Sequence, residues 1–312
     1  MTGDFRQTLP VIPRGTRADQ IHSCVKASEL WKKVQVFHLT QNVRTLLSGD
    51  PHAKDFEEVL LKMGEGKLTE TGIIDVPEEV CVANKNDLIT LIFPHIEINY
   101  KTEGWLSKRA ILAPKNKMVD DLNSNLLQKI PSQQKIYYSK DFPINAHDSI
   151  KFPQEVLNGL DFPCVPPHIL VLKIGSPVMC MRNIDPPILV NGTRLKITKL
   201  GEHYLEAEIL VGSHAGTLVD IPRIPFIPNG FSIEMKRVQF PVKLSFSMSI
   251  NKAQGQTLSK VGLYLEEHCF SHGQLYVGCS RVGSQNNLKI YCPDNKAKNV
   301  VFKEVFGEIK RM

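Results

Sequence analysis

A short apolar run, ended by a proline and followed by a long amphipathic stretch, constrains the fold more than any other feature. Ala110–Ala113 is entirely apolar, and Pro114 ends the run. From Lys115 to Ile130 the apolar residues recur at helical intervals, at Met118, Val119, Leu122, Leu126 and Ile130. A buried strand followed by a crossover helix is the repeating unit of α/β domains, so this spacing predicts an α/β fold.

Similar elements are predicted on both sides of this unit. The sequence predicts a short buried strand from Gln35 to Leu39, and a helix over Ala53–Gly64. The apolar side of that helix is expected to carry Phe56, Val59, Leu60 and Met63. After Pro241, the segments VKLSFSM, KVGLYL and LKIYC are typical of strands, and SHGQLYVGCSRV is typical of a helix. The tail KNVVFKEVFGEI is expected to form a short closing helix.

The sequence between Pro163 and Pro241 has a different texture. Prolines and glycines are frequent there, and β-branched residues alternate with polar ones. Turns are expected at Gly175-Ser176, Gly201-Glu202 and Gly212-Ser213. These features predict a small all-β unit, a barrel or a sandwich, inserted into the α/β domain.

Composition narrows the class of protein only slightly. Of 312 residues, 42% are hydrophobic and 22% are charged, as in an ordinary globular protein, and the net charge of +6 is compatible with a polyanionic partner. The seven cysteines include no C-x-x-C pair, which is typical of a reduced intracellular protein. No run is long and apolar enough to span a membrane, and the N-terminus lacks a secretory pattern.

Two polar stretches near the N-terminus are candidate phosphate sites. In Gly3–Gln7, the amide of Gln7 can donate and accept, so it could sense a terminal phosphate or orient a water; the alternative is a solvated turn. In Leu39–Arg44, Arg44 follows the predicted strand, where its planar fork suits bidentate phosphate binding. A lone arginine at such a position is, alternatively, a surface ion pair.

Two further stretches follow the predicted insert. Met248–Leu258 ends a strand in a polar loop that can offer backbone N–H groups, amides, a hydroxyl and one cation to a phosphate backbone; the alternative is a polar connection. Within Ser271–Arg281, Arg281 is placed to act as an arginine finger. His272 lacks a nucleophile or carboxylate pattern, which leaves a structural or a DNA-contacting role.

The blocks GDFRQTLPVIPRG, LTQNVR, ILAPKNKMVDDLN, VNGTRLKITKL, FPVKLSFSMSINKAQGQTL and SHGQLYVGCSRV occur in this order. Together they resemble the later motifs of Pif-family DNA helicases, especially the helicase part of Helitron transposons. The resemblance implies RecA-like motor domains of the P-loop NTPase type, with a small SH3-like β-barrel inserted into the second. Residues 1–30 would be a remnant of the first motor domain, 31–160 and 241–312 the second, and 161–240 the barrel.

The resemblance also implies a role for each candidate residue. Gln7, Arg44 and Arg281 would be the catalytic residues. Gly255 and Gln256 would bind the nucleotide together with the two arginines. The residues expected to contact single-stranded DNA are Lys252, Gln254, Thr257 and His272.

Two departures from the family pattern matter. Gly278-Cys279 stands where the family has Ala-Leu, and a glycine inside a helix costs about 1 kcal/mol relative to alanine, so a looser helix and a less firmly held Arg281 are expected. The sequence also has no Gly-Lys-Ser/Thr loop and no Asp-Glu pair; Gly64–Thr69 fails as a phosphate loop because Leu61 and Leu68 occupy required positions. ATP and Mg²⁺ are therefore expected for the complete family enzyme, but no tight binding and no ATP hydrolysis by this chain alone.

Three interpretations remain open from the sequence. The first is the C-terminal part of an ATP-dependent helicase that acts on single-stranded DNA in unwinding, repair, recombination or transposon replication. The second is a non-catalytic single-stranded nucleic-acid-binding module or transposon remnant, and the third is a scaffold whose barrel binds a protein. The family further implies a monomer in the nucleus, with no membrane and no metal site.

Overall fold

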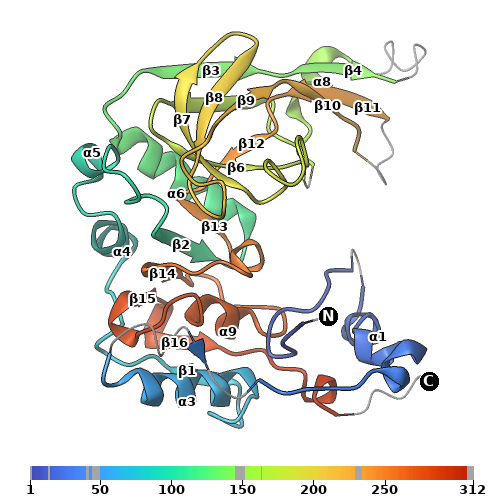
Figure 1. The fold of residues 1–312 in the computed structure, drawn as a ribbon, viewed down its shortest axis with the longest axis vertical. Coiled ribbons are helices and arrows are strands. Elements are labelled where there is room, and N and C mark those ends of the chain that lie inside the picture. The colour runs from blue at the N-terminus through green and yellow to red at the C-terminus, as the bar shows by residue number, and fades with distance from the viewer. Residues whose placement is uncertain are drawn as a thin grey trace. The chain divides into compact units, whose positions relative to one another are not determined.

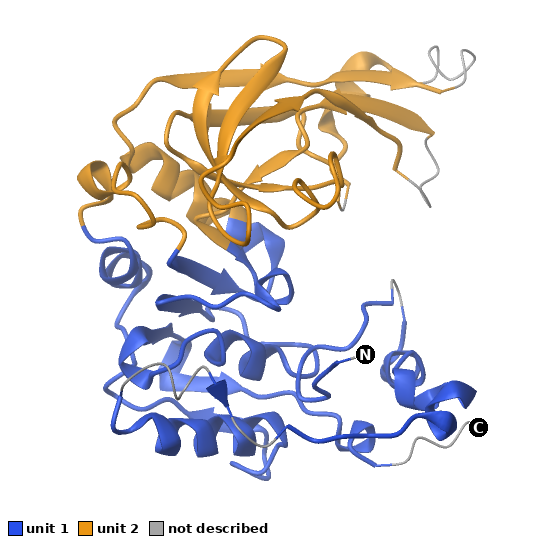
Figure 2. Cartoon of the chain, viewed as in Figure 1, with its two compact units in different colours: residues 1–94, 108–119, 248–312 blue, residues 95–107, 120–247 orange. Residues whose placement is uncertain are grey.

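The chain folds into two compact units. The computed structural model describes residues 2–12, 15–39, 42–43, 50–144, 152–162, 164–228 and 234–307. Residues 1–94, 108–119 and 248–312 make up unit 1, and residues 95–107 and 120–247 make up unit 2 (Figure 2). In the described part of the chain, no helix combines the length and apolar character needed to cross a membrane.

Unit 1 combines helices with a mainly parallel sheet (Figure 1). Its helices are α1 (Arg17–His22), α3 (Ala53–Gly64), α4 (Lys85–Ile92), α9 (Gln274–Cys279) and the first residues of α6 (Asn116–Lys129). Its 3-10 helices are η1 (Val25–Ala27), η2 (Glu29–Lys33), η3 (Ile250–Ala253), η4 (Gln285–Asn287), η5 (Pro293–Asn295) and η6 (Lys303–Val305). Its strands are β1 (Ile73–Asp75), β2 (Arg109–Ala113), β13 (Ser247–Ser249, which starts in unit 2), β14 (Lys260–Tyr264), β15 (Leu288–Tyr291) and β16 (Lys296–Lys298).

A four-stranded sheet forms the centre of unit 1, in the order β13-β2-β14-β15. β14 pairs in parallel with β2 on one side and with β15 on the other. The predicted strand at Ala110–Ala113 is confirmed, and all of its side chains are buried. The helix predicted after it is also confirmed as α6, and its predicted apolar stripe is buried. Parallel strands buried on both faces account for the continuous apolar runs in the sequence.

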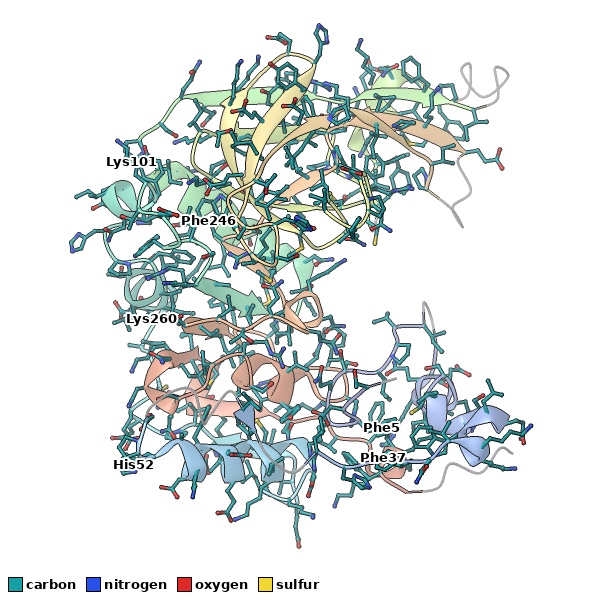
Figure 3. All side chains as sticks on the ribbon, viewed as in Figure 1. Phe5, Phe37, His52, Lys101, Phe246 and Lys260 are labelled. Carbon is teal, nitrogen blue, oxygen red and sulfur yellow. The ribbon has the colours of Figure 1, made fainter. Side chains whose placement is uncertain are left out.

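The strand predicted from Gln35 to Leu39 is wrong. Residues 34–39 belong to the described part of the chain, yet they lie in neither a helix nor a strand. Phe37, labelled in Figure 3, is 80% exposed, and Leu39 is 93% exposed. The pattern is typical of a strand, but no strand of the described residues lies beside it to accept it.

Three other predictions need correction. Val59 of α3 is 42% exposed, because the helix buries the narrower stripe of Phe56, Leu60 and Met63. The predicted strand VKLSFSM is two strands that join different sheets, β12 and β13. Within its described residues, the closing tail forms only the 3-10 helix η6.

Unit 2 is rich in strands, which pair antiparallel. Its helices are α5 (Ile96–Asn99), the larger part of α6, and α8 (Gln154–Gly159). Its strands are β3 (Gln134–Tyr138), β4 (Lys140–Pro143), β5 (Ile169–Lys173), β6 (Pro177–Cys180), β7 (Arg194–Leu200), β8 (Tyr204–Ile209), β9 (Leu218–Pro222), β10 (Ile224–Phe226), β11 (Met235–Gln239) and β12 (Val242–Leu244). They form a sheet β12-β6-β7-β8-β9, a sheet β10-β11-β4 and a ribbon β3-β5.

The prediction that the region between Pro163 and Pro241 consists of short strands agrees with the structure, although unit 2 starts well before residue 161. β3, β4 and α8 lie in unit 2, whereas the resemblance assigns their residues to the second motor domain. An apolar core unites the strands, and Phe246, labelled in Figure 3, is also fully buried in this unit.

A buried ion pair stabilises one end of unit 2. Arg237 donates to both carboxylate oxygens of Asp141, at 3.0 and 2.8 Å, and neither side chain is exposed. Ser139 donates a third hydrogen bond to the same carboxylate, at 2.7 Å. Arg237 also donates to backbone carbonyls, including that of Leu157 at 3.0 Å. The two buried charges of Arg237 and Asp141 are tolerated because they pair with each other and make further hydrogen bonds.

Replacing Arg237 with methionine should lower the free energy of unfolding of unit 2 by about 3–5 kcal/mol, because the Asp141 carboxylate would stay buried without its cation. Denaturant unfolding of the full chain measures this loss. The matched control is Lys243→Met, which breaks the partly exposed pair with Asp120 and should cost less than about 1 kcal/mol. Equal losses for the two variants would contradict the assigned importance of the buried pair.

Candidate functional site

The candidate site in unit 1 lies where strands of the parallel sheet end. A cavity of about 340 Å³ is lined by residues at or just after the ends of β2 and β13, by residues around the start of α9, and by Val11 and Gln20 near the N-terminus. Most of the lining residues are polar: Gln20, Lys115, Asn116, Ser249, Asn251, Ser271 and Gln274. Ligands of α/β proteins bind outside the carboxyl ends of the strands, and these amide, hydroxyl and ammonium groups suit an anionic ligand.

Gln274 connects two walls of this cavity. Its side-chain oxygen accepts from the backbone N–H groups of Phe270 and Ser271, at 3.0 and 3.2 Å. Its amide nitrogen donates to Asn251 Oδ1 at 3.3 Å. Gln274 is 1% exposed, so its amide acts as a fixed brace between the start of α9 and the loop after β13.

The polar loop predicted as a phosphate-binding element follows β13 as η3 and a turn. Lys252, Gly255 and Thr257 are exposed, whereas Gln254 and Gln256 are half-buried. Gly255 has a φ of +77°, a conformation that favours glycine, and its position is open to solvent. The loop therefore presents one cation and one hydroxyl to solvent on a tightly turned backbone.

Arg281 holds this loop in place. Its guanidinium donates to the carbonyls of Ala253 and Gln256, both at 3.3 Å, and to the carbonyl of Val277 at 2.8 Å. A fourth bond, to Ser280 Oγ, measures 2.8 Å, and Arg281 is 3% exposed. In this arrangement Arg281 is directed at protein carbonyls, and the expectation that it is loosely held is wrong.

The packing of Gly278 explains why α9 is not the loose helix that was predicted. A Cβ at this position would lie 2.8 Å from Leu263 Cδ2 of β14, so the glycine lets α9 pack closely on the sheet. The helix is also shorter than predicted: α9 ends at Cys279, and Arg281 follows it. Close packing of α9 thus offsets the low helix propensity of glycine.

The N-terminal segment that contains Gln7 lies against α9 and α3. The Tyr276 hydroxyl donates to Asp4 Oδ2 at 2.9 Å, and Arg6 donates to Glu65 Oε1 at 2.6 Å. Burial, and then the Asp4 carboxylate, raise the pKa of Tyr276, which keeps it a donor. Gln7 is half-buried, and no described residue hydrogen-bonds to its side-chain amide. The contacts of Asp4 and Arg6 therefore hold Gln7 in place, and hydrogen bonds of its own side chain do not.

His272 joins this segment to the C-terminal part of unit 1. Its Nε2 donates to the Phe5 carbonyl at 2.8 Å, and its Nδ1 accepts from the Phe302 N–H at 2.9 Å. Phe5 is labelled in Figure 3. His272 has no exposed surface, which leaves no ring atom for DNA, so the structure favours the structural alternative for this residue. Burial lowers the pKa of His272, although the Phe5 carbonyl and Asp4 oppose the shift.

Next to His272, Gly273 allows the N-terminal segment that contains Arg6 and Gln7 to lie close to the start of α9. Gly273 has a φ of +70°, and a Cβ there would lie 2.2 Å from the Arg6 carbonyl oxygen. The structure thus brings Gln7, His272, Arg281 and the loop of Lys252 together around α9. Arg44 lies outside the described residues.

Sequence reasoning missed Lys115 and Asn116 of the cavity. Both follow a predicted strand directly, which was the available signal, but they were assigned only to the amphipathic helix. Lys115 is ion-paired with Glu267, a partner that the sequence could not indicate.

Acid should weaken unit 1 through His272. Its native pKa lies below the value of about 6.5 expected for an unfolded chain, so below that pH the unfolded state binds the extra proton. The stability that His272 provides is complete above pH 6.5 and is lost as the pH falls toward the native pKa, by up to about 1.4 kcal/mol per pH unit.

Urea unfolding followed by the fluorescence of Trp31, whose ring centroid lies 5.7 Å from that of Phe5, measures this effect. The stability difference between the native chain and His272→Asn should shrink between pH 7 and 5. A difference that stays constant over this range would show that His272 does not titrate as expected.

Comparisons with known proteins support one family. The model described as "PIF1-like helicase" matches residues 1–72, and the one described as "DNA helicase Pif1, 2B domain" matches residues 155–200. ATP-dependent DNA helicase PIF1 of Xenopus laevis is 28% identical over 94% of this chain and 41% of its own length. The Emericella nidulans PIF1 helicase is 25% identical over 93% of the chain and 41% of its length. This chain thus spans less than half the length of either relative.

Solved structures agree with the fold. The crystal structure of Pif1 helicase from Candida albicans has a TM-score of 0.64 at 24% identity, over 97% of this chain and 66% of that one. Pif1 helicase from Bacteroides in complex with ADP-AlF3 and ssDNA has a TM-score of 0.63 at 20% identity, over 96% and 63%. These neighbours have a RecA-like helicase fold. The order of the sequence motifs, the parallel sheet of unit 1 and these matches together support a Pif1-family helicase.

Proposed function

We propose that this chain is the C-terminal part of an ATP-dependent DNA helicase that acts on single-stranded DNA. Unit 1 would supply the second RecA-like motor domain, and residues 161–240 the inserted SH3-like barrel. The observation that carries the proposal is the cavity at the strand ends, where amide, hydroxyl and ammonium groups lie beside a loop that is held by Arg281. The relative from Bacteroides, described in complex with ADP-AlF3 and ssDNA, supports both ligands for the complete protein.

The proposed DNA contacts lie on the polar loop and in the cavity. Lys252 and Thr257 are exposed on that loop, and Gln254 is half-buried beside them. Lys115 and Asn116 line the cavity at the end of β2. An ammonium group pairs with phosphate, and amides and hydroxyls add neutral hydrogen bonds that position the strand without reading its sequence.

The proposed nucleotide half-site consists of Gln7, Arg44, Arg281, Gly255 and Gln256. Arg281 would exchange its carbonyl partners for a phosphate when a nucleotide arrives, and because the Gln256 carbonyl is one of them, the exchange would move the DNA-binding loop. Mg²⁺ neutralises phosphate charge in this chemistry. The described residues include no group of three His, Cys, Asp or Glu side chains that could hold a metal, so no step is assigned to a metal bound by this chain.

An N-terminal sheet of the complete protein would explain the exposed segment Val34–Leu39. Its apolar residues are all exposed, and Val34 and Val36 are 51% and 47% exposed. An unpaired, apolar, extended segment favours addition to a sheet edge. The segment follows residues 1–30, the proposed remnant of the first motor domain, and is proposed as part of the second motor domain.

The second candidate is a non-catalytic single-stranded nucleic-acid-binding module or a transposon remnant of Helitron type. The burial of Arg281 favours it, because its guanidinium is bound to protein carbonyls while Lys252 and Thr257 stay exposed. Nuclear residence belongs to both candidates as an inference from the family.

The single-strand affinity of the chain should fall with salt, because each phosphate contact releases counterions. Lys252→Ala should weaken the binding of labelled oligo(dT) and reduce the slope of log affinity against log salt by about 0.7. Fluorescence anisotropy at several salt concentrations measures both quantities. Lys62→Ala, which removes an exposed cation of α3, is the control and should leave the slope unchanged. An affinity that does not depend on salt would contradict both candidate functions.

ATP hydrolysis separates the two candidates. We expect none from the chain alone, and DNA-stimulated hydrolysis when it is joined to an N-terminal part that carries the Gly-Lys-Ser/Thr and Asp-Glu motifs. In the joined protein, Arg281→Lys should lower kcat by roughly 10³-fold, because lysine keeps the charge and loses the fork. Its oligo(dT) affinity, measured in parallel, should stay within a few-fold, which excludes collapse of the loop. Full activity of Arg281→Lys would contradict the assigned role.

A further inference from the structure

One long extended segment of unit 2 exposes large apolar side chains along one face. β3 and β4 run in one line, joined by Ser139 (Figure 1). Along this segment, Tyr137, Ser139 and Asp141 are buried, and the residues between them are exposed. The exposed fractions are 44% for Ile136, 57% for Tyr138, 45% for Phe142 and 46% for Ile144, and Lys140 lies exposed at the centre. We call the face formed by residues 136, 138, 140, 142 and 144 the outer stripe.

The inner side of the segment fixes the outer stripe in place. Asp141 is bound by Arg237 and Ser139, and the Ser139 N–H donates to the His168 carbonyl at 2.8 Å. Side chains alternate strictly along an extended strand, so a fixed inner side determines what the outer side presents. The fixed backbone therefore keeps the Tyr138 and Phe142 rings at the surface, and the centroid of the Tyr138 ring lies 5.6 Å from that of His168.

Neighbouring strands widen the outer stripe and add a second cation. Ile169 of β5 is opposite Tyr138, and Lys236 of β11 is opposite Phe142. The Lys236 ammonium lies 5.5 Å from the centroid of the Phe142 ring. Glu234 lies just before β11, and its carbonyl accepts from the Ile144 N–H at 3.0 Å. The centre of the stripe thus alternates aromatic, cationic and aromatic side chains.

We propose that the outer stripe is a second binding surface for single-stranded nucleic acid, in which Tyr138 and Phe142 stack on bases while Lys140 and Lys236 pair with phosphates. Side chains two residues apart on a strand are separated by roughly 7 Å, so the two rings are roughly 13 Å apart and contact different bases. Aromatic rings with interspersed cations bind single strands with little sequence preference. The inference shares its ligand with the proposed function but uses a different unit of the chain.

A protein partner would use the same surface differently. It would contact the aliphatic members, Ile136, Ile144 and Ile169, and would gain little from a lysine placed between two aromatic rings. The alternation at the centre of the stripe matches a chain in which flat bases and phosphates recur, which is why nucleic acid is favoured.

The experiment uses the full chain and labelled oligo(dT) in fluorescence anisotropy. Tyr138→Ala/Phe142→Ala should weaken binding at least about tenfold, since each stacked base contributes measurably. Lys140→Ala should reduce the salt slope by about 0.7. Because these side chains are exposed, the variants should fold, and circular dichroism checks this. Phe142→Trp should keep the affinity, and its fluorescence should be quenched when oligo(dT) is added.

Two controls match the substitutions. Tyr204→Ala removes a 39% exposed aromatic ring of β8, and Lys101→Ala removes a cation that follows α5 and is labelled in Figure 3. Both should bind as the native chain does. Equal losses in the controls and in the stripe variants would overturn the proposal, because they would indicate non-specific attraction.

Further outcomes separate this inference from the proposed function. Loss of binding in Lys252→Ala, with none in the stripe variants, would overturn the outer stripe and leave the proposed function intact. The reverse result would support the stripe alone. Unchanged oligo(dT) affinity, together with self-association that Tyr138→Ala/Phe142→Ala abolishes, would assign the stripe to a protein interface and overturn the proposal.

Discussion

The pairing of β2 with β13 in the sheet of unit 1 determines how this unit can work. Strands that are neighbours in a sheet bring their flanking residues together, even when the strands are far apart in sequence. Lys115 and Asn116 follow β2, and the residues at the end of β13 reach the same cavity from another part of the chain. Without this pairing, the polar residues of the site would be separate features of a linear sequence.

The polar groups around α9 form a second level of organisation. Arg281 is buried and uses its guanidinium on carbonyls, and His272 is buried and uses both ring nitrogens on the backbone. The buried N–H groups of these two side chains donate to carbonyls of other parts of the main chain. Each side chain therefore fixes the position of the segment to which it is bound. The loop of Lys252 and the segment of Gln7 are positioned in this way. Both are functional candidates, and both depend on side chains that are bound to the protein's own backbone.

Local pattern predicted the elements that bury a complete apolar face. α3, β2, α6, β14 and β15 appear where the sequence places them, because helical or continuous apolar spacing is itself the cause of burial. The strand predicted from Gln35 to Leu39 failed because a strand needs a neighbour, and spacing does not reveal whether one exists. VKLSFSM was predicted as one strand because nothing local marks the point where the chain passes from one sheet to another.

The sequence predicted which residues belong to the candidate site, but it did not predict how they are arranged in space. The residue types and their order indicated the loop of Lys252 and the stretch around Arg281. The contacts that decide their roles join residues that are distant in sequence, such as Arg281 with Ala253 and His272 with Phe5. The DNA-contacting role of His272 was implied by the family resemblance, with a structural role left open, and its burial favours the structural role. The expectation that Arg281 is loosely held followed from the helix propensity of glycine, and tertiary contacts overrode it.

The bond between His272 and the Phe5 carbonyl links positions 267 residues apart. Bringing such distant segments together requires closing a very long loop, which costs entropy and makes the contact late to form. During synthesis, residues 4–7 leave the ribosome well before their docking surface on α9, because His272 follows Phe5 by 267 residues. The candidate site is thus assembled only after α9 has been translated, and until then the segment of Gln7 is exposed to chaperones, proteases and other chains.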